Sequence, residues 1–496
     1  MVEILYKSTR GSSELLKSSE AIIKGIASDG GLYVPAHMPK IDCPLEELGK
    51  LNYKELAVKV LGKFLTDFTV EELSSCVSRA YDDKFDDLKI APVKKVGDAY
   101  FLELFHGPTI AFKDMALSIL PHLLTTAIKK QNLDKEVVIL TATSGDTGKA
   151  ALEGFNNIDG IKVIVFFPEH GVSEIQKLQM KTHKGNNTYV FGIEGNFDDA
   201  QSGVKKIFVD KDINKALSSK NYMFSSANSI NIGRLIPQIV YYFYAYLQMA
   251  EEKNILLGEK INVVVPTGNF GNILAGYYAK EMGLPINKLI CASNENKVLY
   301  DFIKTGIYDR KREFHMTSSP SMDILISSNL ERLLYILTDE NYDEVKSMME
   351  SLNKNGEYEI SDIMKEKMMD FASQYASEEE TKTAIKKVFE KYDYLMDTHT
   401  AVAYSAYEKY EAENKDNNKY LVISTASPYK FPVNVLESLD VSIEQSDEYA
   451  AIENMSLISK TKIPYAVKDI NKKDIIHNKV CDKNNMIDMV KEVLNI

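Results

Sequence analysis

The sequence predicts an α/β protein with two lobes, each built around a parallel β-sheet. From about residue 135 onward, short apolar runs alternate with polar or glycine-containing turns and with helical stretches. Strands that alternate with helices imply right-handed βαβ units, whose strands lie parallel in one sheet. This pattern covers residues 137–209 and resumes at residue 261, and a long helical stretch at 230–249 separates the two runs. We therefore expect two α/β lobes.

The individual elements follow from apolar runs and helical periodicity. In the first run, strands are expected at 137–140, 161–167 and 189–193, and helices at 147–157, 173–183 and 198–209. In the second run, strands are expected at 261–265, 289–292 and 420–424. The helix of the second run should end at Met282, because Gly283 and Pro285 follow it.

Three other segments depart from this alternation. Helical periodicity at 45–64 and 70–81, with the turn-rich segment GIASDGGLYVP, predicts a separate N-terminal domain. Residues from about 330 to 395 are rich in Glu, Lys and Met at helical spacing, which predicts a helical excursion on the second lobe. The expected division is an N-terminal domain at 1–92, lobes at 93–255 and 256–450, and a C-terminal tail at 451–496.

Composition narrows the class of protein. The chain has 496 residues, 45% hydrophobic and 26% charged, and a net charge of −12. This acidic balance argues against nucleic acid or an anionic membrane as a partner, because phosphate binding needs clustered cations. No apolar run approaches the ~20 residues that span a bilayer, and the start of the chain lacks the layout of a secretion signal. We expect a cytoplasmic protein, monomeric or homodimeric, that acts on a small molecule.

Cysteine and histidine spacing gives no sign of a metal site. The four cysteines are far apart and form no CxxC pair, and the eight histidines show neither HExxH nor HxxxH spacing. This pattern fits neither a disulfide framework nor a zinc site. We therefore expect no bound metal.

The first segment with chemistry in it is ELFHGPTIAFKD, which ends in Lys113 and Asp114. Gly107 and Pro108 force a turn, and a single lysine then precedes a helix. Taken alone, Lys113 would be an ordinary surface lysine. A lysine becomes a Schiff-base nucleophile only where a pocket desolvates it and lowers its pKa.

The second segment, TATSGDTG at residues 141–148, lies between the first strand and its helix. Backbone N–H groups at a helix start, together with short hydroxyl side chains, bind carboxylate or phosphate. A P-loop would need glycine where Thr143 stands and Ser or Thr where Ala150 stands, so that interpretation fails. A helix cap would explain single residues of the segment but not all of it.

The third segment, PTGNFGN at residues 266–272, lies between the strand at 261–265 and the next helix. Two glycines allow backbone amides to approach an anion closely, and the helix dipole adds to that attraction. Glycine turns after strands are common, so this segment alone is weak support. Loops of this kind converge at the carboxyl ends of a parallel sheet. One lysine and two anion sites suit an aldehyde cofactor with a phosphate group, together with an amino-acid substrate.

The motifs as a set resemble the threonine synthases, in the longer microbial and fungal branch of the fold-type II pyridoxal-phosphate enzymes. The resemblance rests on HGPTIAFKD, TATSGDTG, PTGNFGN, SSANSINIGRLIPQ and STASPYKF, and the pieces YKSTRG and GIASDGGLYVP agree with it. It extends in order from residue 6 to about residue 432. It implies the fold-type II architecture and pyridoxal 5′-phosphate as the cofactor.

The resemblance also implies roles for residues of the cofactor site. Lys113 would form the Schiff base with the cofactor, and Thr425 would face the pyridine nitrogen. Asp146 would approach the cofactor's 3′-oxygen. Asparagine is frequent at that position elsewhere in the fold type, so the protonation of this contact is open. The loop that binds the cofactor phosphate corresponds to Gly268, Asn269, Phe270, Gly271 and Asn272.

Substrate contacts are implied in the same way. The substrate carboxylate would be received by Ser144, Gly145 and Thr147. In the NSxNxxR pattern, Ser229 and Arg234 match positions that hold the substrate phosphate. The alternative interpretation of those two residues is a helix cap and a surface arginine.

The implied reaction converts O-phospho-L-homoserine and water to L-threonine and phosphate, by γ-elimination and β-addition of water. Two alternatives stay open at this point. A phospho-lyase acting on O-phosphothreonine or phosphohomoserine would release 2-oxobutyrate from the same scaffold. A catalytically silent ligand-binding homologue would keep the fold without the reaction.

Overall fold

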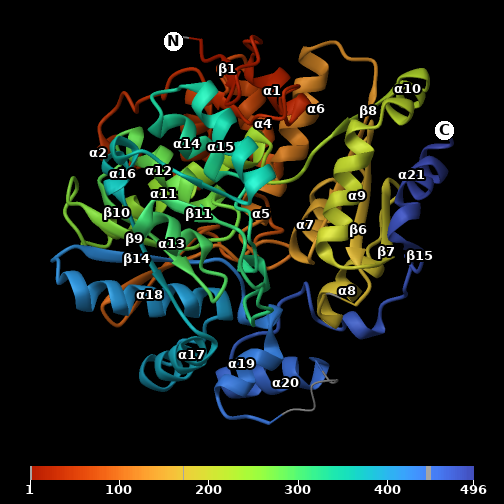
Figure 1. The fold of residues 1–496 in the computed structure, drawn as a ribbon. Coiled ribbons are helices and arrows are strands. Elements are labelled where there is room, and N and C mark those ends of the chain that lie inside the picture. Colours follow the sequence, from red (N-terminus) through yellow and green to blue (C-terminus); the bar gives the residue numbers. More distant parts are fainter. Residues whose placement is uncertain (1–2, 171, 443–447) are drawn as a thin grey trace.

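Two β-sheets, one of six strands and one of five, organise the chain (Figure 1). The computed structural model describes residues 3–170, 172–442 and 448–496. The six-stranded sheet lies to the left in Figure 1, and the five-stranded sheet stands to the right. The expected α/β class with parallel sheets is confirmed.

The six-stranded sheet is parallel except at one edge, where β3 pairs antiparallel with β4. Its strands, in spatial order, are β13 (Phe371–Tyr375), β10 (Ile286–Ser293), β9 (Ile261–Pro266), β14 (Lys419–Ser424), β4 (Ala99–Glu103) and β3 (Val93–Val96). Along β9, Val263 and Val265 face one hydrophobic core, whereas Val264 faces another. Alternate side chains of a strand point to opposite faces, so a strand buried on both faces is apolar throughout.

The five-stranded sheet is parallel throughout its pairings. Its strands, in spatial order, are β15 (Val480–Asp482), β7 (Thr188–Glu194), β6 (Ile161–Pro168), β5 (Glu136–Ala142) and β8 (Tyr222–Ser225). The central strands carry the predicted apolar runs, and both of their faces are buried in hydrophobic clusters.

Helices cover both faces of each sheet, as the βαβ pattern requires. The helices associated with the five-stranded sheet are α7 (Asp146–Gly154), α8 (Glu174–Lys181), α9 (Phe197–Val209), α10 (Lys211–Ser219) and α21 (Met486–Leu494). Those on the six-stranded sheet are α12 (Gly271–Glu281), α13 (Val298–Thr305) and α18 (Thr398–Asn414). In Figure 1, α18 lies below this sheet, and α12 lies above it with α11 (Ile232–Glu251).

The N-terminal segment packs against α11 and shares its core. The segment contains β1 (Tyr6–Ser8), α1 (Ser18–Lys24), β2 (Tyr33–Pro35), α2 (Leu45–Leu48), α3 (Tyr53–Phe64) and α4 (Val70–Ala80). One continuous hydrophobic cluster includes residues of α3, α4, α11, α12 and one face of both sheets. The N-terminal segment is therefore joined to the lobes by buried apolar surface.

The predicted helical excursion contains helices and also one strand of the main sheet. Its elements are α14 (Leu330–Leu337), α15 (Tyr342–Asn355), β12 (Glu357–Glu359), α16 (Asp362–Lys367), β13 and α17 (Glu378–Tyr392). β12 pairs antiparallel with β11 (Ile307–Asp309), and β13 pairs parallel with β10. The segment is mostly helical, but the helical prediction missed β13, because β13 is a short edge strand with polar residues in it.

Two predicted boundaries also differ from the strand pairing. The first lobe was expected to begin at residue 93, but β3 and β4 belong to the sheet of the second lobe, where β4 pairs with β14. The expected C-terminal tail is also structured. It contains α20 (Glu448–Ser459), β15 and α21, and β15 pairs with β7 of the five-stranded sheet. In both cases the partner strand lies hundreds of residues away, beyond the reach of local patterns.

The remaining helices connect these layers. They are α5 (Asp114–Leu117), α6 (Leu120–Lys130) and α19 (Pro432–Ser438). Within the described residues, no helix is both long enough and apolar enough to cross a membrane. In Figure 1, α5 lies between the two sheets, which is where the predicted site residues gather.

Candidate active site

Lys113 stands at the end of a loop that follows β4, and this loop is fixed to the chain after β14. The backbone N–H of Leu104 donates to the carbonyl of Ser424 (3.0 Å), and the N–H of Phe112 donates to the carbonyl of Thr425 (2.8 Å). Thr425 itself is buried. The structure therefore brings together two predicted site residues, Lys113 and Thr425, that are far apart in the sequence.

The turn before Lys113 is held by the neighbouring residue Asp114. Its carboxylate accepts bonds from the backbone N–H (2.8 Å) and the hydroxyl (2.6 Å) of Thr109. A Cβ on Gly107 would lie 2.5 Å from the Cβ of Asp114, so this position requires glycine. The turn is thus closed by short-range bonds that fix where Lys113 begins.

The side chain of Lys113 is 13% exposed, unlike that of an ordinary surface lysine. Its Nζ donates to Oδ2 of Asp146 (3.1 Å) and to Oγ of Ser321 (3.1 Å). Burial lowers the pKa of Lys113, while the charge of Asp146 partly opposes that effect. A desolvated amine with a depressed pKa has the properties that a nucleophilic lysine needs.

The predicted carboxylate loop follows β5 and begins α7. The hydroxyl of Thr143 accepts from the backbone N–H groups of Gly145 (3.0 Å) and Gly148 (2.9 Å). Gly145 has a φ of 131°, which only glycine adopts readily. The N-cap residue of α7 is Gly145, which has no side chain to cap the helix. Ser144 and Thr147 are half-buried on this loop, at a helix start suited to an anion.

Asp146 is bonded to two lysines, one of which the sequence analysis missed. Its Oδ1 lies 3.0 Å from Nζ of Lys430, and its Oδ2 lies 3.1 Å from Nζ of Lys113. Burial alone would raise the pKa of Asp146, but the charges of Lys113 and Lys430 hold it well below its usual range. In this arrangement, the two ammonium groups favour the ionised form of the Asp146 carboxyl.

The predicted phosphate loop lies between β9 and α12, and its glycines differ in importance. A Cβ on Gly268 would lie 2.5 Å from the carbonyl oxygen of Ser321. A Cβ on Gly271 would be in ordinary contact, 3.5 Å from Asn329 Nδ2, and Gly271 has no left-handed φ. The left-handed residue is Phe270, with a φ of 63°. Gly271 therefore needs no glycine-specific φ, because the turn is made one residue earlier.

The first turn of α12 offers donors that have no side-chain cap. The Oδ1 of Asn272 accepts from the hydroxyls of Tyr241 (2.8 Å) and Tyr242 (2.6 Å). Its Nδ2 is buried and has no partner among the described residues. Asn269 is exposed, and its carbonyl accepts from Asn329 Nδ2 (2.9 Å). The helix start and the Asn272 amide can therefore receive an anion.

Residues 310–329 form a loop that lies against both Lys113 and the phosphate loop. Ser321 contacts Lys113, and the hydroxyl of Ser327 donates to the carbonyl of Gly268 (2.7 Å). Asn329 Nδ2 also donates to Oγ of Ser229 (3.2 Å). Ser321, Ser327 and Asn329 were not predicted as site residues, because nothing in their local sequence distinguishes them from an ordinary polar loop.

Arg234 lies in α11 and is buried, so the alternative of a surface arginine is wrong. One Nη donates to the carbonyl of Ala227 (2.6 Å), while Nε has no partner among the described residues. Burial lowers the pKa of Arg234 to about 10, so it stays charged at neutral pH. The helix cap is Asn231, whose side chain accepts from the N–H of Gly233. Ser229 is therefore not needed as the cap.

These observations fit pyridoxal phosphate. The side chain of Lys113 is largely buried, the N-cap residue of α12 makes no side-chain cap, and Gly268 stands where a Cβ would collide with the Ser321 carbonyl. Unpartnered buried donors occur at Asn272 and Arg234, as expected where an anionic ligand completes the hydrogen bonding. One site would hold the cofactor phosphate, and the other remains for the substrate.

Comparison with known proteins decides the family. Models of the threonine synthase N terminus, of pyridoxal-phosphate dependent enzymes and of the threonine synthase C-terminal region match residues 5–81, 90–426 and 400–491. The chain belongs to the threonine synthase family. The predicted family, the fold-type II architecture and the pyridoxal-phosphate cofactor are confirmed.

Relatives of this threonine synthase family member include proteins named threonine synthase and proteins named threonine synthase-like 1. Threonine synthase of Saccharomyces cerevisiae is 38% identical over 457 residues, which cover 86% of this chain and 87% of the relative. Human threonine synthase-like 1 is 41% identical over 437 residues, which cover 85% of this chain but only 58% of the relative. The chain thus spans less than two thirds of the length of those longer relatives.

Solved structures agree with the family. Threonine synthase from yeast superposes with a TM-score of 0.88 at 34% identity, over 99% of both chains. The threonine synthase from Brucella melitensis, solved with bound pyridoxal phosphate, gives a TM-score of 0.86 at 34% identity, over 99% of this chain and 98% of that one.

The two glycines of the phosphate loop give a matched test of cofactor binding in this family member. Gly268→Ala should raise the dissociation constant for pyridoxal phosphate about tenfold or more, since the added Cβ collides with the backbone of residue 321. Gly271→Ala should change it much less, because its Cβ has room and its N–H is kept. Absorbance titration of cofactor into both apo-proteins measures the difference. Equal constants for the two variants would contradict the assignment.

His106 is a charged anchor just before the lysine loop of this threonine synthase family member. Its ring nitrogens contact Asp86 (2.6 Å) and Glu103 (3.1 Å). Burial alone would lower the pKa of His106, but the two carboxylates raise it to about 9. The raised pKa means that the anchor stabilises the fold fully below pH 6.5, and that this contribution is lost as pH rises toward 9.

We therefore expect the stability difference between the wild type and His106→Gln to shrink as pH rises from 6.5 to 9.5. From the pKa difference, the change in this stability difference is at most about 3 kcal/mol. The real change should be smaller, because Asp86 is exposed and solvent screens its charge. Urea unfolding of both proteins at the two pH values gives the measurement. A difference that is constant with pH would mean that His106 acts by packing alone.

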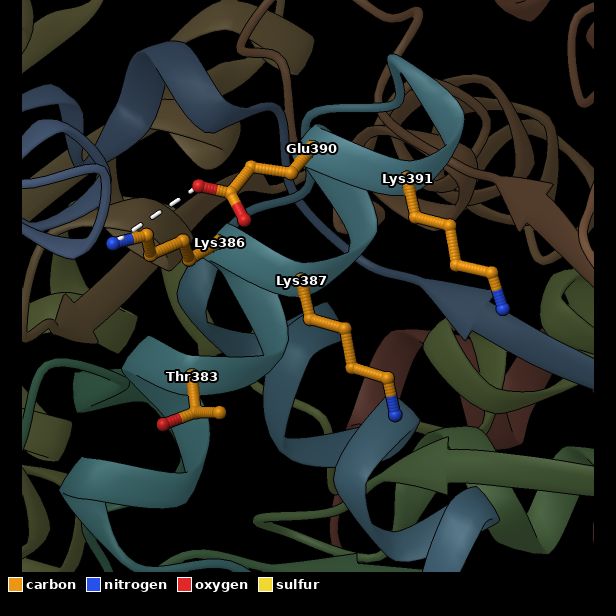
Figure 2. Close-up of a pocket in the computed structure, with 5 residues that line it drawn as sticks. All are labelled: Thr383, Lys386, Lys387, Glu390 and Lys391. Carbon is orange, nitrogen blue, oxygen red and sulfur yellow. Dashed lines mark ion pairs between the residues drawn. The ribbon is translucent and has the colours of Figure 1, made fainter.

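A hollow on the outer face of α17 does not belong to the site (Figure 2). It is lined by Thr383, Lys386, Lys387, Glu390 and Lys391. Lys386 pairs with Glu390 and Asp440, and Lys387 pairs with Glu408. Two of the three lysines are therefore already paired with carboxylates, and the helix face is exposed to solvent. The hollow therefore supports no functional assignment.

Proposed function

We propose that the chain converts O-phospho-L-homoserine and water to L-threonine and phosphate. The observation that carries this proposal is the buried guanidinium of Arg234, whose Nε has no partner among the described residues. Its charge is close enough to lower the pKa of Lys113. A buried cation with a free donor near the reactive lysine suits a phosphorylated substrate, because a guanidinium can donate two parallel bonds to phosphate.

The substrate's two anionic ends would bind at separate places. Ser229 and Arg234 would hold the γ-phosphate at the start of α11, while Ser144, Gly145 and Thr147 would receive the carboxylate at the start of α7. Each helix start contributes N–H groups and the positive end of its dipole. Holding both ends fixes the carbon chain between them next to Lys113, which supplies much of the advantage of a positioned reaction.

The proton transfers would be carried out by Lys113. When bound, pyridoxal phosphate supplies an electron sink for negative charge at the substrate's Cα and Cβ. The Lys113 amine would take the proton from Cα and later act at Cβ, since its burial favours the neutral base. The γ-phosphate leaves as inorganic phosphate and one water adds at Cβ, so the atoms of phosphohomoserine and water are all accounted for in threonine and phosphate. Thr425 would provide a neutral hydroxyl opposite the pyridine nitrogen.

The cofactor contacts would come from the loop before α12. Gly268, Phe270 and Gly271 would let backbone N–H groups reach the cofactor phosphate, and the free Nδ2 of Asn272 would add a side-chain donor. Asn269 would contribute its backbone, since its side chain is exposed.

One experiment tests the function directly. Purified protein is incubated with cofactor and O-phospho-L-homoserine, and the products are identified by chromatography. Threonine and phosphate in equal amounts are expected. Release of 2-oxobutyrate with phosphate would support the phospho-lyase alternative, which the similarity to threonine synthase-like 1 keeps in view. Absence of any product, with cofactor bound, would indicate a ligand-binding homologue.

We further propose that the enzyme acts in the cytoplasm, as a monomer or homodimer. In support of a reducing compartment, all four cysteines are free thiols. The substrate is a small molecule, and no role for nucleic acid or membrane is proposed. Size-exclusion chromatography with light scattering would determine the oligomeric state.

A further inference from the structure

Lys430 is a fully buried lysine in the cofactor site, and the reaction outlined above gives it no role. It lies after β14, in the short helical turn Pro428–Lys430, and its side chain is 0% exposed. Its Nζ contacts Oδ1 of Asp146 (3.0 Å) and Oε1 of Gln179 (3.1 Å). Burial of an isolated charge is strongly unfavourable, so this position needs the Asp146 carboxylate.

The carboxylate of Asp146 is shared between two amines. Oδ1 receives Lys430 and Nε2 of Gln176 (2.9 Å), whereas Oδ2 receives Lys113 and, at 3.4 Å, the hydroxyl of Ser321. Both oxygens are therefore engaged. A single negative charge thus faces two potential positive charges at a largely buried position.

The charges around Lys113 are consistent with this sharing. Asp146 raises the proton affinity of Lys113, while Lys430 and Arg234 lower it. Asp114 is the next carboxyl in the chain, and burial raises its pKa to about 6. From α8, only the neutral Gln176 and Gln179 face the pair. Without Lys430, the Asp146 carboxylate would form an ion pair with Lys113 alone and would stabilise the protonated form of the Lys113 amine.

We propose that Lys430 is a positioning residue that engages one oxygen of Asp146 and thereby keeps the Lys113 amine free to react. Lys430 does not itself contact the reacting carbons in this proposal. The inference rests on Lys113 being the reactive lysine of the proposed function, but it does not depend on which product is released.

The test measures the protonation of Lys113 in the full-length protein. In apo-protein, the rate of Lys113 modification by trinitrobenzenesulfonate is followed against pH, with the site quantified by peptide mass spectrometry. In holoenzyme, the visible absorbance of the bound cofactor is titrated. Lys430→Met should move both midpoints upward by about one pH unit. A nearby charge shifts a pKa by roughly 1–3 units, and the removed cation disfavours the protonated form of Lys113. Modification at neutral pH should become about tenfold slower.

Two matched variants separate this effect from a general loss of a buried lysine. Lys430→Arg retains the charge, so its midpoints should stay near those of the wild type. Lys149→Met removes another largely buried lysine, which pairs with Glu153 (2.8 Å) on α7, and should leave both midpoints unchanged. A Lys430→Met protein with wild-type midpoints would overturn the proposal. Equal shifts in Lys149→Met would also overturn it.

A second comparison covers the case in which Lys430→Met does not fold because Asp146 loses its partner. Lys430→Gln is then titrated beside the wild type, because it removes the charge but keeps an N–H donor for the Asp146 carboxylate. Its midpoints should also move upward by about one unit, since the cation that repels a charged Lys113 is gone. Wild-type midpoints in Lys430→Gln would overturn the proposal. If the midpoints shift as predicted but no threonine is formed, the proposed function alone is overturned.

Discussion

Replacement of Lys113 with alanine should reduce turnover by at least about 10³-fold and remove the visible absorbance band of the bound cofactor. Proton transfer by a positioned group contributes roughly 10²–10⁴-fold, and the covalent attachment of the cofactor is lost as well. The fold should survive, because Asp146 keeps its ion pair with Lys430 when Lys113 is gone. Steady-state kinetics, absorbance spectra and circular dichroism together measure these outcomes.

Lys149→Ala is the matched control for that experiment. Lys149 is also largely buried and paired with a carboxylate, Glu153, but it has no place in the proposed chemistry. It should keep its turnover and its absorbance band. Substantial turnover in the Lys113→Ala protein would mean that another group holds the cofactor, and the assignment of the site would be wrong.

Arg234→Lys is expected to lower kcat/KM for phosphohomoserine by about 10- to 150-fold. Lysine keeps the charge but loses the planar fork, and a hydrogen bond to a charged group is worth roughly 1.5–3 kcal/mol. The absorbance of the bound cofactor should remain near normal, because the cofactor phosphate is assigned to the loop before α12. Any side reaction with an unphosphorylated amino acid, such as serine, should be affected much less.

The comparison of the two substrates makes this prediction specific. Arg10→Lys provides a control, because that guanidinium is bonded at two points to Glu331 (2.9 and 2.7 Å). It should lose stability while the ratio of the two kcat/KM values stays unchanged. Equal losses for both substrates in Arg234→Lys would mean that Arg234 only supports the fold.

The central strands of both sheets could be predicted from the sequence for a physical reason. β5, β6, β9 and β14 are covered on both faces, so nearly every residue in them is apolar and the signal is local. Edge strands carry a weaker signal. β3 (VKKV) has exposed lysines at its centre, and β13 and β15 are short and partly polar. Their strand conformation depends on pairing with distant segments.

The same distinction explains which site residues could be found. Lys113, Asp146 and Gly268 follow strands in glycine-containing turns, and such turns can be recognised locally. Lys430 acquires its importance from contact with Asp146, although it lies five residues after Thr425 in a motif that was already recognised. Ser321 reaches Lys113 from the loop at 310–329, and no local pattern indicates that contact.

The pairing of β15 with β7 has a consequence for synthesis of the chain. Gly192 of β7 is translated roughly 290 residues before its partner Val480, and ribosomes add about 5–20 residues per second. The outer edge of the five-stranded sheet therefore remains uncovered for on the order of 15 s to 1 min. An uncovered edge can pair with another chain. During that interval, low local concentration or chaperones must prevent such pairing, until β15 is synthesised and covers the edge of the sheet.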